Sequence, residues 1–381
     1  MAGTFGPPRP NWFLSAVQNL GVKKSKCATP PSPPAMRIFS NGVYYPNWHI
    51  YRKQPPSSLN LDVISHVFYA FAWIRPDGSI YFSDEWADSQ IEVDGVHGCL
   101  QACAALKKRS RVLKVILSIG GGGQGSEPFA AVAHDAEKRK VFARSALDIV
   151  LKYGLDGIDI DWEHPSTPQQ GFDYVKLLNE LRMYLPRPHF VLTSALPGTE
   201  WALQYINLAE ASNQLDLLNL MAYDFVGPWV DTCGHHAQLS TPKEPHNHAA
   251  TISCHSGVAI LLSKGVPKHK ILLGIPVYGR SFLGTKGVGH AFKDQGGNEG
   301  TFDYRELPLP STQEEVDEEV GAAYCVTKEG EFVTYDNPKT VSMKACFVKE
   351  NELAGLFYWT GTGDGAGSRS LVYNGYVGLH S

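Results

Sequence analysis

Short apolar runs alternate along this chain with longer stretches in which apolar and polar residues recur at helical spacing. A run that is apolar throughout and rich in β-branched or aromatic residues is typical of a strand buried on both faces. Eight such runs predict strands, at residues 38–45, 63–74, 112–121, 154–163, 190–196, 215–224, 271–280 and 354–360.

The intervening stretches predict helices. In residues 137–153 and 172–184, apolar side chains recur every three or four positions, which places them on one helical face. The alternation of strands with helices indicates right-handed βαβ units and a parallel sheet. Eight repeats of this unit predict an α/β fold of the (β/α)₈ type, a TIM barrel.

One interval breaks the alternation. Residues 281–353 are too many for a single crossover helix, and they contain strand-like segments at 302–307, 322–327 and 331–335 and a helix-like segment at 341–350. We therefore expect a small α+β insertion between strands seven and eight that raises one wall of the barrel. The predicted domains are an N-terminal extension (1–35), a catalytic barrel (36–281 and 351–381) and the insertion (282–350).

The first 35 residues are rich in proline and end in Pro30-Pro31-Ser32-Pro33-Pro34. Proline at this density is incompatible with a helix or a central strand, so we expect a loosely ordered extension. The apolar segment 12–17 is too short for the core of a signal peptide, and prolines precede it. We therefore expect a cytoplasmic protein or one exported by an unconventional route, and the sequence leaves both open.

Composition removes several classes of function. The 381 residues carry a net charge of −4, which provides no basic surface for nucleic acid. No apolar run approaches the roughly 20 residues of a membrane span, and we expect a monomer without membrane contact. Seven cysteines leave at least one unpaired, and Cys99 and Cys103 lack a zinc-binding spacing. The sequence therefore indicates no metal and no cofactor.

Residues 154–163 read GLDGIDIDWE, with four acidic side chains inside an apolar run. Side chains alternate along a strand, so Asp159, Asp161 and Glu163 point to one face, with neighbours roughly 7 Å apart. Burying this stack costs several kcal/mol for each uncompensated charge. The acids therefore share protons and do chemistry or, alternatively, form a structural cluster bound to an arginine or a metal. Asp156 falls on the opposite face and is assigned a structural role.

Active sites of this barrel fold form at the carboxyl ends of the strands, where Glu163 is the outermost acid. Loss of hydration and the neighbouring charge of Asp161 are expected to raise the pKa of Glu163 and keep it protonated near neutral pH. A protonated carboxyl is what a leaving oxygen requires in general acid catalysis. We expect Asp161 to turn between Asp159 and Glu163 and to pass a shared proton inward.

Aromatic and cationic side chains on the same rim suit a sugar. Trp359 ends strand eight, where it is placed to stack on a pyranose ring, and Arg280 offers a planar set of donors. Tyr44 and Phe71 lie near the ends of strands one and two. Three further tryptophans fall in rim loops, with ordinary packing as the alternative for each: Trp48, Trp201 and Trp229.

Several short motifs occur in order on the predicted strands. Residues 118–121 read SIGG, residues 156–163 read DGIDIDWE, residues 221–224 read MAYD and residues 278–280 read YGR, followed by Trp359. They match SxGG, DxxDxDxE, MxYD and the later strand motifs of glycoside hydrolase family 18. From residue 36 to residue 381, the chain therefore resembles the chitinases of that family, and among them the fungal type with an insertion between strands seven and eight.

The resemblance implies a retaining, substrate-assisted hydrolysis of β-1,4 linkages between N-acetylglucosamine units in chitin or chitooligosaccharides. It assigns Glu163 as the acid that protonates the glycosidic oxygen. Asp161 then orients the acetamide with help from Asp159, and Tyr223 donates a hydrogen bond to the acetamide oxygen. The residues expected to contact the sugar are Tyr44, Trp48, Phe71, Gly121, Gly122, Met221, Asp224, Trp229, Tyr278, Arg280 and Trp359.

One position departs from the family pattern. The family often carries a tryptophan after SxGG, where this chain has Gly122-Gly123-Gln124. We expect weaker sugar binding beyond the cleavage point, unless Trp201 or Trp229 covers the gap.

Two clusters stand apart from these motifs. The first is a histidine-rich segment with two nearby cysteines, which has no recognisable zinc spacing and is expected to be a solvated loop over the cleft. Its members are Cys233, His235, His236, His246, His248, Cys254 and His255. The second is the acidic run 314–319, which is expected to be a solvated face or loop of the insertion.

Two other functions fit the same fold. A chitin-binding lectin is the first, although such relatives usually lose the acid that Glu163 supplies here. An endo-β-N-acetylglucosaminidase acting on N-glycans is the second, since it shares the acidic motif. The insertion and the aromatic rim favour a linear polymer instead.

Overall fold

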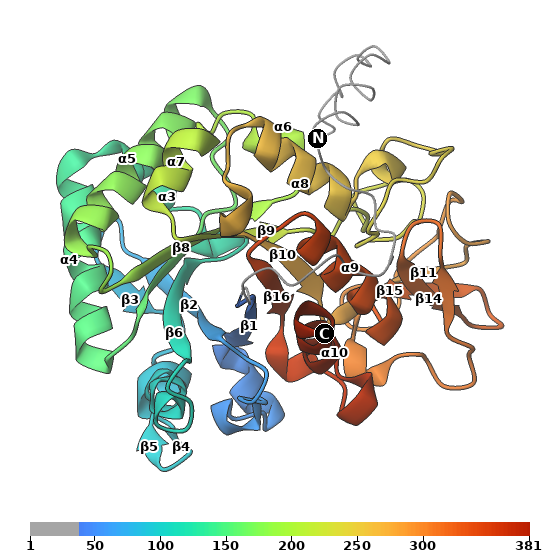
Figure 1. The fold of residues 1–381 in the computed structure, drawn as a ribbon, viewed down its shortest axis with the longest axis horizontal. Helices are drawn as coiled ribbons and strands as arrows, with labels where there is room; N and C mark the ends of the chain where they lie inside the picture. The colour runs from blue at the N-terminus through green and yellow to red at the C-terminus, as the bar shows by residue number, and fades with distance from the viewer. Residues whose placement is uncertain (1–37) are drawn as a thin grey trace.

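A closed barrel of eight parallel strands lies at the centre of the computed structural model, with helices around it (Figure 1). The structure describes residues 38–381, and the predicted extension 1–35 lies outside them. The barrel strands are β1 (Ser40–Pro46), β2 (His66–Ile74), β6 (Lys114–Gly120), β7 (Gly157–Asp161), β8 (Val191–Pro197), β9 (Leu217–Met221), β10 (Ile271–Pro276) and β16 (Gly355–Trp359). Because β1 pairs with both β2 and β16, the barrel closes, and the predicted fold is confirmed.

The barrel strands are buried on both faces. Side chains that point into the barrel form one apolar cluster, in which Tyr44, Phe68 and Phe357 are at most 2% exposed. Side chains on the other face, such as Val43 and Val67, belong to the larger core beneath the helices. A strand covered on both sides needs apolar residues at successive positions, and this explains the continuous runs in the sequence.

Helices cover the outside of the barrel (Figure 1). They are α2 (Cys99–Ala105), α3 (Phe129–His134), α4 (Ala136–Tyr153), α5 (Pro168–Tyr184), α6 (Glu200–Leu203), α7 (Leu208–Gln214), α8 (Cys254–Ser263), α9 (Pro338–Glu350) and α10 (Leu371–His380). The predicted helices 137–153 and 172–184 are α4 and α5. α5 starts earlier than predicted because the side chain of Thr167 accepts from the backbone N–H of Gln170 and Pro168 occupies the first turn. Among the described residues, no helix combines the length and apolar character needed to cross a membrane.

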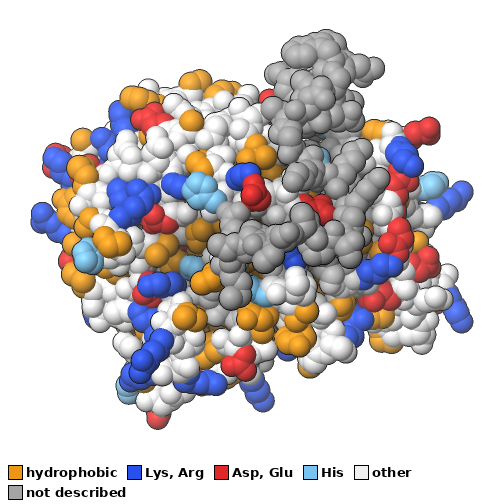
Figure 2. Space-filling model, in the orientation of Figure 1, with side chains coloured by type: hydrophobic (Ala, Val, Ile, Leu, Met, Phe, Trp, Pro, Cys, Tyr) orange, Lys and Arg blue, Asp and Glu red, His pale blue; other side chains and the backbone are white. Residues whose placement is uncertain are grey.

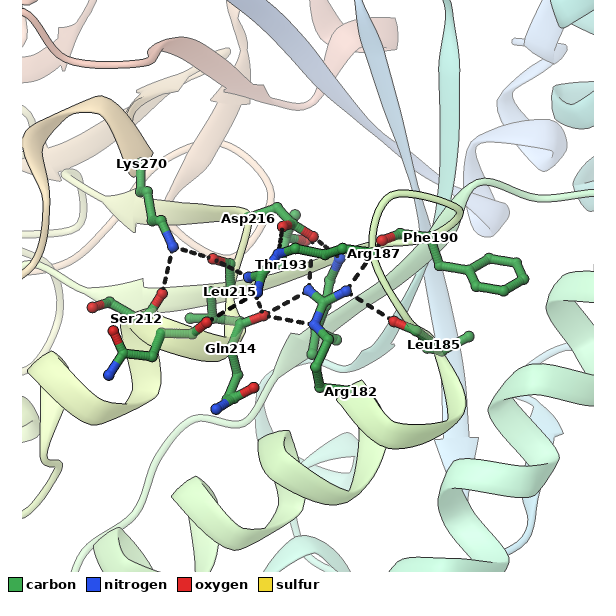
Figure 3. Close-up of polar contacts among 12 residues, drawn as sticks. Arg182, Leu185, Arg187, Phe190, Thr193, Ser212, Gln214, Leu215, Asp216 and Lys270 are labelled. Carbon is green, nitrogen blue, oxygen red and sulfur yellow. Dashed lines mark hydrogen bonds and ion pairs between the residues drawn. The ribbon is translucent and has the colours of Figure 1, made fainter.

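Polar contacts tie the amino ends of the strands β8 and β9 to α5 (Figure 3). Arg182 of α5 donates to the carboxylate of Asp216 at 2.7 Å and to the carbonyl of Gln214 at 2.6 Å. Arg187 donates to the same carboxylate at 2.5 Å, and Lys270 donates to the carbonyl of Leu215 at 2.8 Å. These cations satisfy carbonyls at the carboxyl end of α7, at the pole of the barrel opposite Glu163.

Asp156 lies at the same pole, just before β7. Its carboxylate accepts from Lys107 Nζ at 2.9 Å and from the backbone N–H of Val115 at 2.8 Å. Asp156 therefore anchors β7 to β6 and has the structural position that its parity in the sequence indicated.

A second sheet, antiparallel and five-stranded, lies beside the barrel at the right of Figure 1. Its strands are β11 (Tyr278–Leu283), β12 (Thr301–Asp303), β13 (Glu315–Asp317), β14 (Ala322–Val326) and β15 (Glu331–Tyr335). The predicted single strand 271–280 is therefore two strands in two sheets, since β10 ends at Pro276 and β11 starts at Tyr278. A single residue, Val277, separates the two strands, so no loop marks the change of sheet in the sequence. Two small pairings complete the strands: β3 (Ile80–Phe82) on β2, and β4 (Glu92–Val93) with β5 (Val96–His97).

The acidic run of the insertion is only partly solvated. Glu314 accepts hydrogen bonds from Tyr335 and Asn337 and forms an ion pair with Arg369 at 3.0 Å. The expectation of a solvated loop is wrong for this residue, because the run leads into β13 and lies against the barrel. The division of the chain at residues 282 and 350 stays a proposal. Two observations argue against these boundaries. The second sheet begins at Tyr278, before residue 282, and α9 packs against α10 and β16 of the barrel.

The surface carries charges of both signs. Lys and Arg side chains and Asp and Glu side chains both occur across the face drawn in Figure 2. This mixture agrees with the small net charge of −4.

Candidate active site

The acidic stack follows β7 from the barrel interior to its open end. Asp159 is fully buried, Asp161 is 4% exposed, and Glu163 lies beyond the strand and is exposed to solvent. Between the last two, Trp162 turns to the outer face and stacks on Phe129 with ring centroids 5.4 Å apart. The alternation predicted from the sequence therefore holds at this end of β7.

Asp159 is held by three hydroxyl groups from three other strands. Tyr44 of β1 donates to Oδ2 at 2.9 Å, Ser118 of β6 donates to Oδ2 at 2.7 Å, and Thr193 of β8 donates to Oδ1 at 2.6 Å. Burial raises the pKa of Asp159, and these bonds limit the rise because they stabilise the carboxylate. Asp159 is thus a buried carboxyl whose charged form is well supported.

Asp161 has the opposite environment. Its Oδ1 is buried and has no hydrogen-bond partner among the described residues. Burial, then the charge of Glu163 and then that of Asp159, raises the pKa of Asp161 well above its ordinary value. Asp159 has three donors whereas Asp161 Oδ1 has none, so burial and the neighbouring charges favour the protonated form of Asp161.

Glu163 stands at the mouth of the barrel. Its backbone N–H donates to Ser126 Oγ at 2.8 Å, and the Ser126 hydroxyl in turn donates to the carbonyl of Gly121 at 2.8 Å. Gly122 lies beside its carboxyl, since a β-carbon built on Gly122 would be 3.6 Å from Glu163 Oε1. Partial burial of the carboxyl, and then the charge of Asp224, raises the pKa of Glu163. An acid in this position keeps its proton at a higher pH than a free glutamate.

Asp224 faces this acid from the end of β9. Its Oδ1 accepts from Tyr278 Oη at 2.6 Å, from Arg280 Nε at 2.7 Å and from His236 Nδ1 at 3.4 Å. Burial alone would raise the pKa of Asp224, but the bonds from His236 and Arg280 and the guanidinium charge outweigh it and hold the pKa well below its usual range. Asp224 therefore stays ionised, and it is the charge that acts on Glu163.

Tyr223 lies among all of these acids. Its ring centroid is 6.2 Å from that of Phe357 and 6.3 Å from that of Tyr278. Burial, and then the charges of Asp161, Asp224, Glu163 and Asp159, raises the pKa of Tyr223 well above its ordinary value. The phenol therefore remains a hydrogen-bond donor.

Aromatic rings form a floor at the end of β16. Trp359 stacks on Phe71 with centroids 5.7 Å apart and planes 24° apart, and it contacts the ring of Trp48 at 6.2 Å. Trp48 is 39% exposed, so part of this surface faces solvent. Large aromatic side chains left exposed beside a row of acids suit the apolar faces of a sugar.

The other rim tryptophans are exposed as well. Trp229 is 55% exposed, and the guanidinium of Arg280 lies 4.8 Å from the centre of its ring. Trp201 is 65% exposed and meets the ring of His164, the residue after Glu163, at 5.2 Å. The sequence left ordinary core packing open as an alternative for both tryptophans, and neither ring is packed in the core.

Tyr44, Gly121 and Met221, which were expected at the sugar, also make contacts inside the barrel. Tyr44 is 2% exposed, and its hydroxyl is engaged by Asp159. Gly121 has φ 89°, and a β-carbon there would come within 2.8 Å of the ring of Phe71. Only glycine at position 121 leaves room for the ring of Phe71. Met221 packs on the interior apolar cluster.

Four residues of the site were missed from the sequence: Ser126, Thr193, Asn219 and His236. Thr193 and Asn219 carried a signal, because each is a polar residue inside an apolar strand run and shares the inward parity of the site. Ser126 and His236 follow the strand ends in loops, where no periodicity predicts direction.

The histidine-rich segment is solvated only in part, since His246 and His248 are exposed as expected. His235 and His236 are 3% and 0% exposed, and His235 Nδ1 lies 3.0 Å from Thr334 Oγ1 of β15. The expectation is wrong for these two residues because the insertion sheet covers them, which the local sequence does not reveal. In the described part of the chain, no three His, Cys, Asp or Glu residues are grouped to hold a metal.

Residues 41–364 match the family model described as glycosyl hydrolases family 18. Chitinase 1 of Aphanocladium album is 35% identical over 368 residues, which cover 90% of this chain and 86% of that protein. Endochitinase 1 of Metarhizium robertsii is 35% identical over 357 residues, which cover 88% and 84% of the two chains. The fold is similar to the crystal structure of the Group IV chitinase of Ostrinia furnacalis, with a TM-score of 0.82 and 24% identity, over 89% of this chain and 99% of that one.

Proposed function

Because the chain belongs to family 18 of the glycosyl hydrolases, we propose that it is a chitinase. Its substrates are chitin and chitooligosaccharides, which it cuts at β-1,4 linkages between N-acetylglucosamine units. The family and the names of its two fungal relatives support this substrate. The observation that carries the proposal is the acidic stack, with Glu163 at the mouth of the barrel and its pKa raised.

In this proposal Glu163 is the general acid. It transfers its proton to the glycosidic oxygen as the bond between that oxygen and the anomeric carbon breaks. The acetamide oxygen of the sugar that contains this anomeric carbon attacks the carbon, and a cyclic oxazolinium ion forms. Water, deprotonated by the Glu163 carboxylate, then opens this ion at the anomeric carbon. Two displacements at one carbon retain the configuration.

Asp161 and Tyr223 act on the acetamide. Asp161 passes its proton inward to Asp159 and accepts a hydrogen bond from the acetamide N–H, and its carboxylate then stabilises the positive charge that develops on the oxazolinium ion. Tyr223 donates its phenolic hydrogen to the acetamide oxygen and so aims the oxygen at the anomeric carbon. Asp159 supports Asp161 from below. We assign Tyr44 to that support and not to the sugar, because its hydroxyl is bound to Asp159.

The remaining residues hold the chain of sugars. Trp359 stacks on the sugar at the cleavage point, with Phe71 and Trp48 continuing the floor. On the opposite wall, the sugars meet side chains from β9, from the segment that follows β9 and from β11. These side chains are those of Met221, Asp224, Trp229, Tyr278 and Arg280.

The leaving side of the site is built from glycine. Gly121 and Gly122 line it, and Gly122 is beside the carboxyl of Glu163. Without a tryptophan after the SIGG motif, sugars beyond the cleavage point bind there weakly. Trp201, exposed and in contact with His164, is the aromatic ring available on this side.

A time course of products from the hexamer of N-acetylglucosamine tests the proposal. We expect shorter oligomers whose new reducing ends are first released as the β-anomer. A first product of α configuration refutes the substrate-assisted route. Turnover of a high-mannose glycopeptide in place of the hexamer indicates the endo-β-N-acetylglucosaminidase, and binding without turnover of either indicates the lectin. Sedimentation of the same sample tests the further proposal that the enzyme acts as a monomer.

A further inference from the structure

Asn219 is a buried polar residue in the centre of the barrel to which the reaction above gives no task. It lies in β9 and is fully buried. Its amide Nδ2 donates to Tyr44 Oη at 2.8 Å, while its Oδ1 has no partner among the described residues. Burying an amide whose oxygen has no hydrogen-bond partner costs free energy, so its hydrogen bond to Tyr44 has to offset part of that cost.

The hydroxyl of Tyr44 lies between Asn219 and Asp159. It accepts from the amide of Asn219 at 2.8 Å and donates to Asp159 Oδ2 at 2.9 Å. A phenol has a single hydrogen to donate. Since the amide of Asn219 presents hydrogens, that single hydrogen can only go to Asp159. The chain of bonds thus has one direction, from β9 through β1 to β7, and each bond in it polarises the next.

The direction of this chain matters for the proton of the acidic stack. Donors from Tyr44, Ser118 and Thr193 stabilise the charged form of Asp159, and that charge in turn raises the pKa of Asp161. A hydroxyl turned away from Asp159 would remove one of the three donors. Asp159 would then bind protons more tightly, and the proton would be drawn away from Asp161.

We propose that Asn219 is a positioning residue of the hydrolytic site, which fixes Tyr44 as a donor to Asp159 and thereby keeps the shared proton on Asp161. Asn219 touches neither the substrate nor the reacting atoms, and it acts through Tyr44 alone. The inference rests on the proposed function, since it assigns a task within the same acidic stack.

The substitution Asn219→Leu tests this inference, because leucine has the same number of side-chain heavy atoms as asparagine, branched at the same carbon, and no polar group. We expect kcat/KM for the hexamer to fall about threefold to tenfold, the effect of one net hydrogen bond. The acidic limb of its pH profile moves to higher pH, because Asp159 must be ionised for activity and holds its proton more tightly in the variant. Asn219→Ser supplies the same test if Asn219→Leu does not fold.

A double-mutant cycle with Tyr44→Phe separates positioning from packing. If Asn219 acts through the hydroxyl of Tyr44, then Asn219→Leu has no further effect on kcat/KM or on the pH profile in the Tyr44→Phe background. Equal effects in both backgrounds, or an unmoved acidic limb in the single variant, overturn the inference.

Asn41→Leu is the matched control. Asn41 is also a buried asparagine of a barrel strand, but its amide donates to the backbone carbonyls of Val63 and Val372. We expect it to lower the melting temperature and leave the pH profile in place. Turnover by the parent enzyme is measured first, and its absence refutes the proposed function itself. Turnover by the parent together with additive effects in the double-mutant cycle refutes only the role of Asn219.

Discussion

Replacing Glu163 by glutamine is the most direct perturbation of the site, because it keeps the size of the side chain and removes its proton. Loss of a general acid costs about 10²–10⁴ in rate. At about 1.36 kcal/mol for each factor of ten, this is roughly 3–5 kcal/mol of transition-state stabilisation. We expect kcat for the hexamer to fall by that factor while the variant still binds the oligosaccharide, since the aromatic floor is untouched.

The same substitution has an expected effect on stability. The charge of Glu163 is, after burial, the largest cause of the raised pKa of Asp161. An amide at position 163 removes this repulsion from a buried cluster, so the melting temperature of Glu163→Gln should equal or exceed that of the parent enzyme. Active sites hold groups that repel one another, and relieving the repulsion commonly stabilises the fold.

Three measurements check these expectations together. Product separation gives kcat, titration calorimetry with the hexamer gives the dissociation constant, and a thermal melt gives the stability. Glu127→Gln is the matched control, because Glu127 is an exposed acid in the loop after β6 and should lose neither rate nor stability. Activity within tenfold of the parent refutes the role of Glu163 as the acid. A fall in melting temperature of several degrees would assign it a structural role instead.

Three further outcomes are expected. Asp224→Asn removes the charge that raises the pKa of Glu163, and because the acid must be protonated, the alkaline limb of the pH–kcat profile should move to lower pH; an unmoved limb contradicts the coupling. Trp359→Ala removes the ring stacked on Phe71 and should raise KM for the hexamer more than it lowers kcat, and steady-state kinetics with an unchanged KM would disprove the stacking role. Arg182→Met removes one of the donors to Asp216 and the arginine's hydrogen bonds to the carbonyls of Gln214, Leu185 and Phe190, and it should lower the free energy of unfolding by about 1.5–3 kcal/mol in a urea titration. We expect kcat to be preserved because Arg182 is at the opposite pole, and a loss of kcat in the folded variant would contradict this.

The sequence predicted the barrel because its strands are buried on both faces, and only continuous apolar runs satisfy that burial. It also predicted which acids share a face, because alternation along β7 is a local property. It did not predict the change of sheet at residue 277, because only Val277 separates the end of β10 at Pro276 from the start of β11 at Tyr278, so no loop marks the boundary. Nor did it predict that the insertion sheet buries His235 and His236, since the covering strand β15 is about a hundred residues away in the chain.

What the sequence determined by itself is thus the set of reactive groups and their order: three acids at alternate positions, followed by a tyrosine and a tryptophan at the ends of later strands. What only the tertiary structure decided is the protonation state of each acid. Asp159 receives three hydroxyl donors from three other strands, whereas Asp161 receives none from the described residues at its Oδ1. The physical reason is that a pKa depends on burial and on partners in space, and barrel closure brings those partners together from β1, β6, β8 and β9.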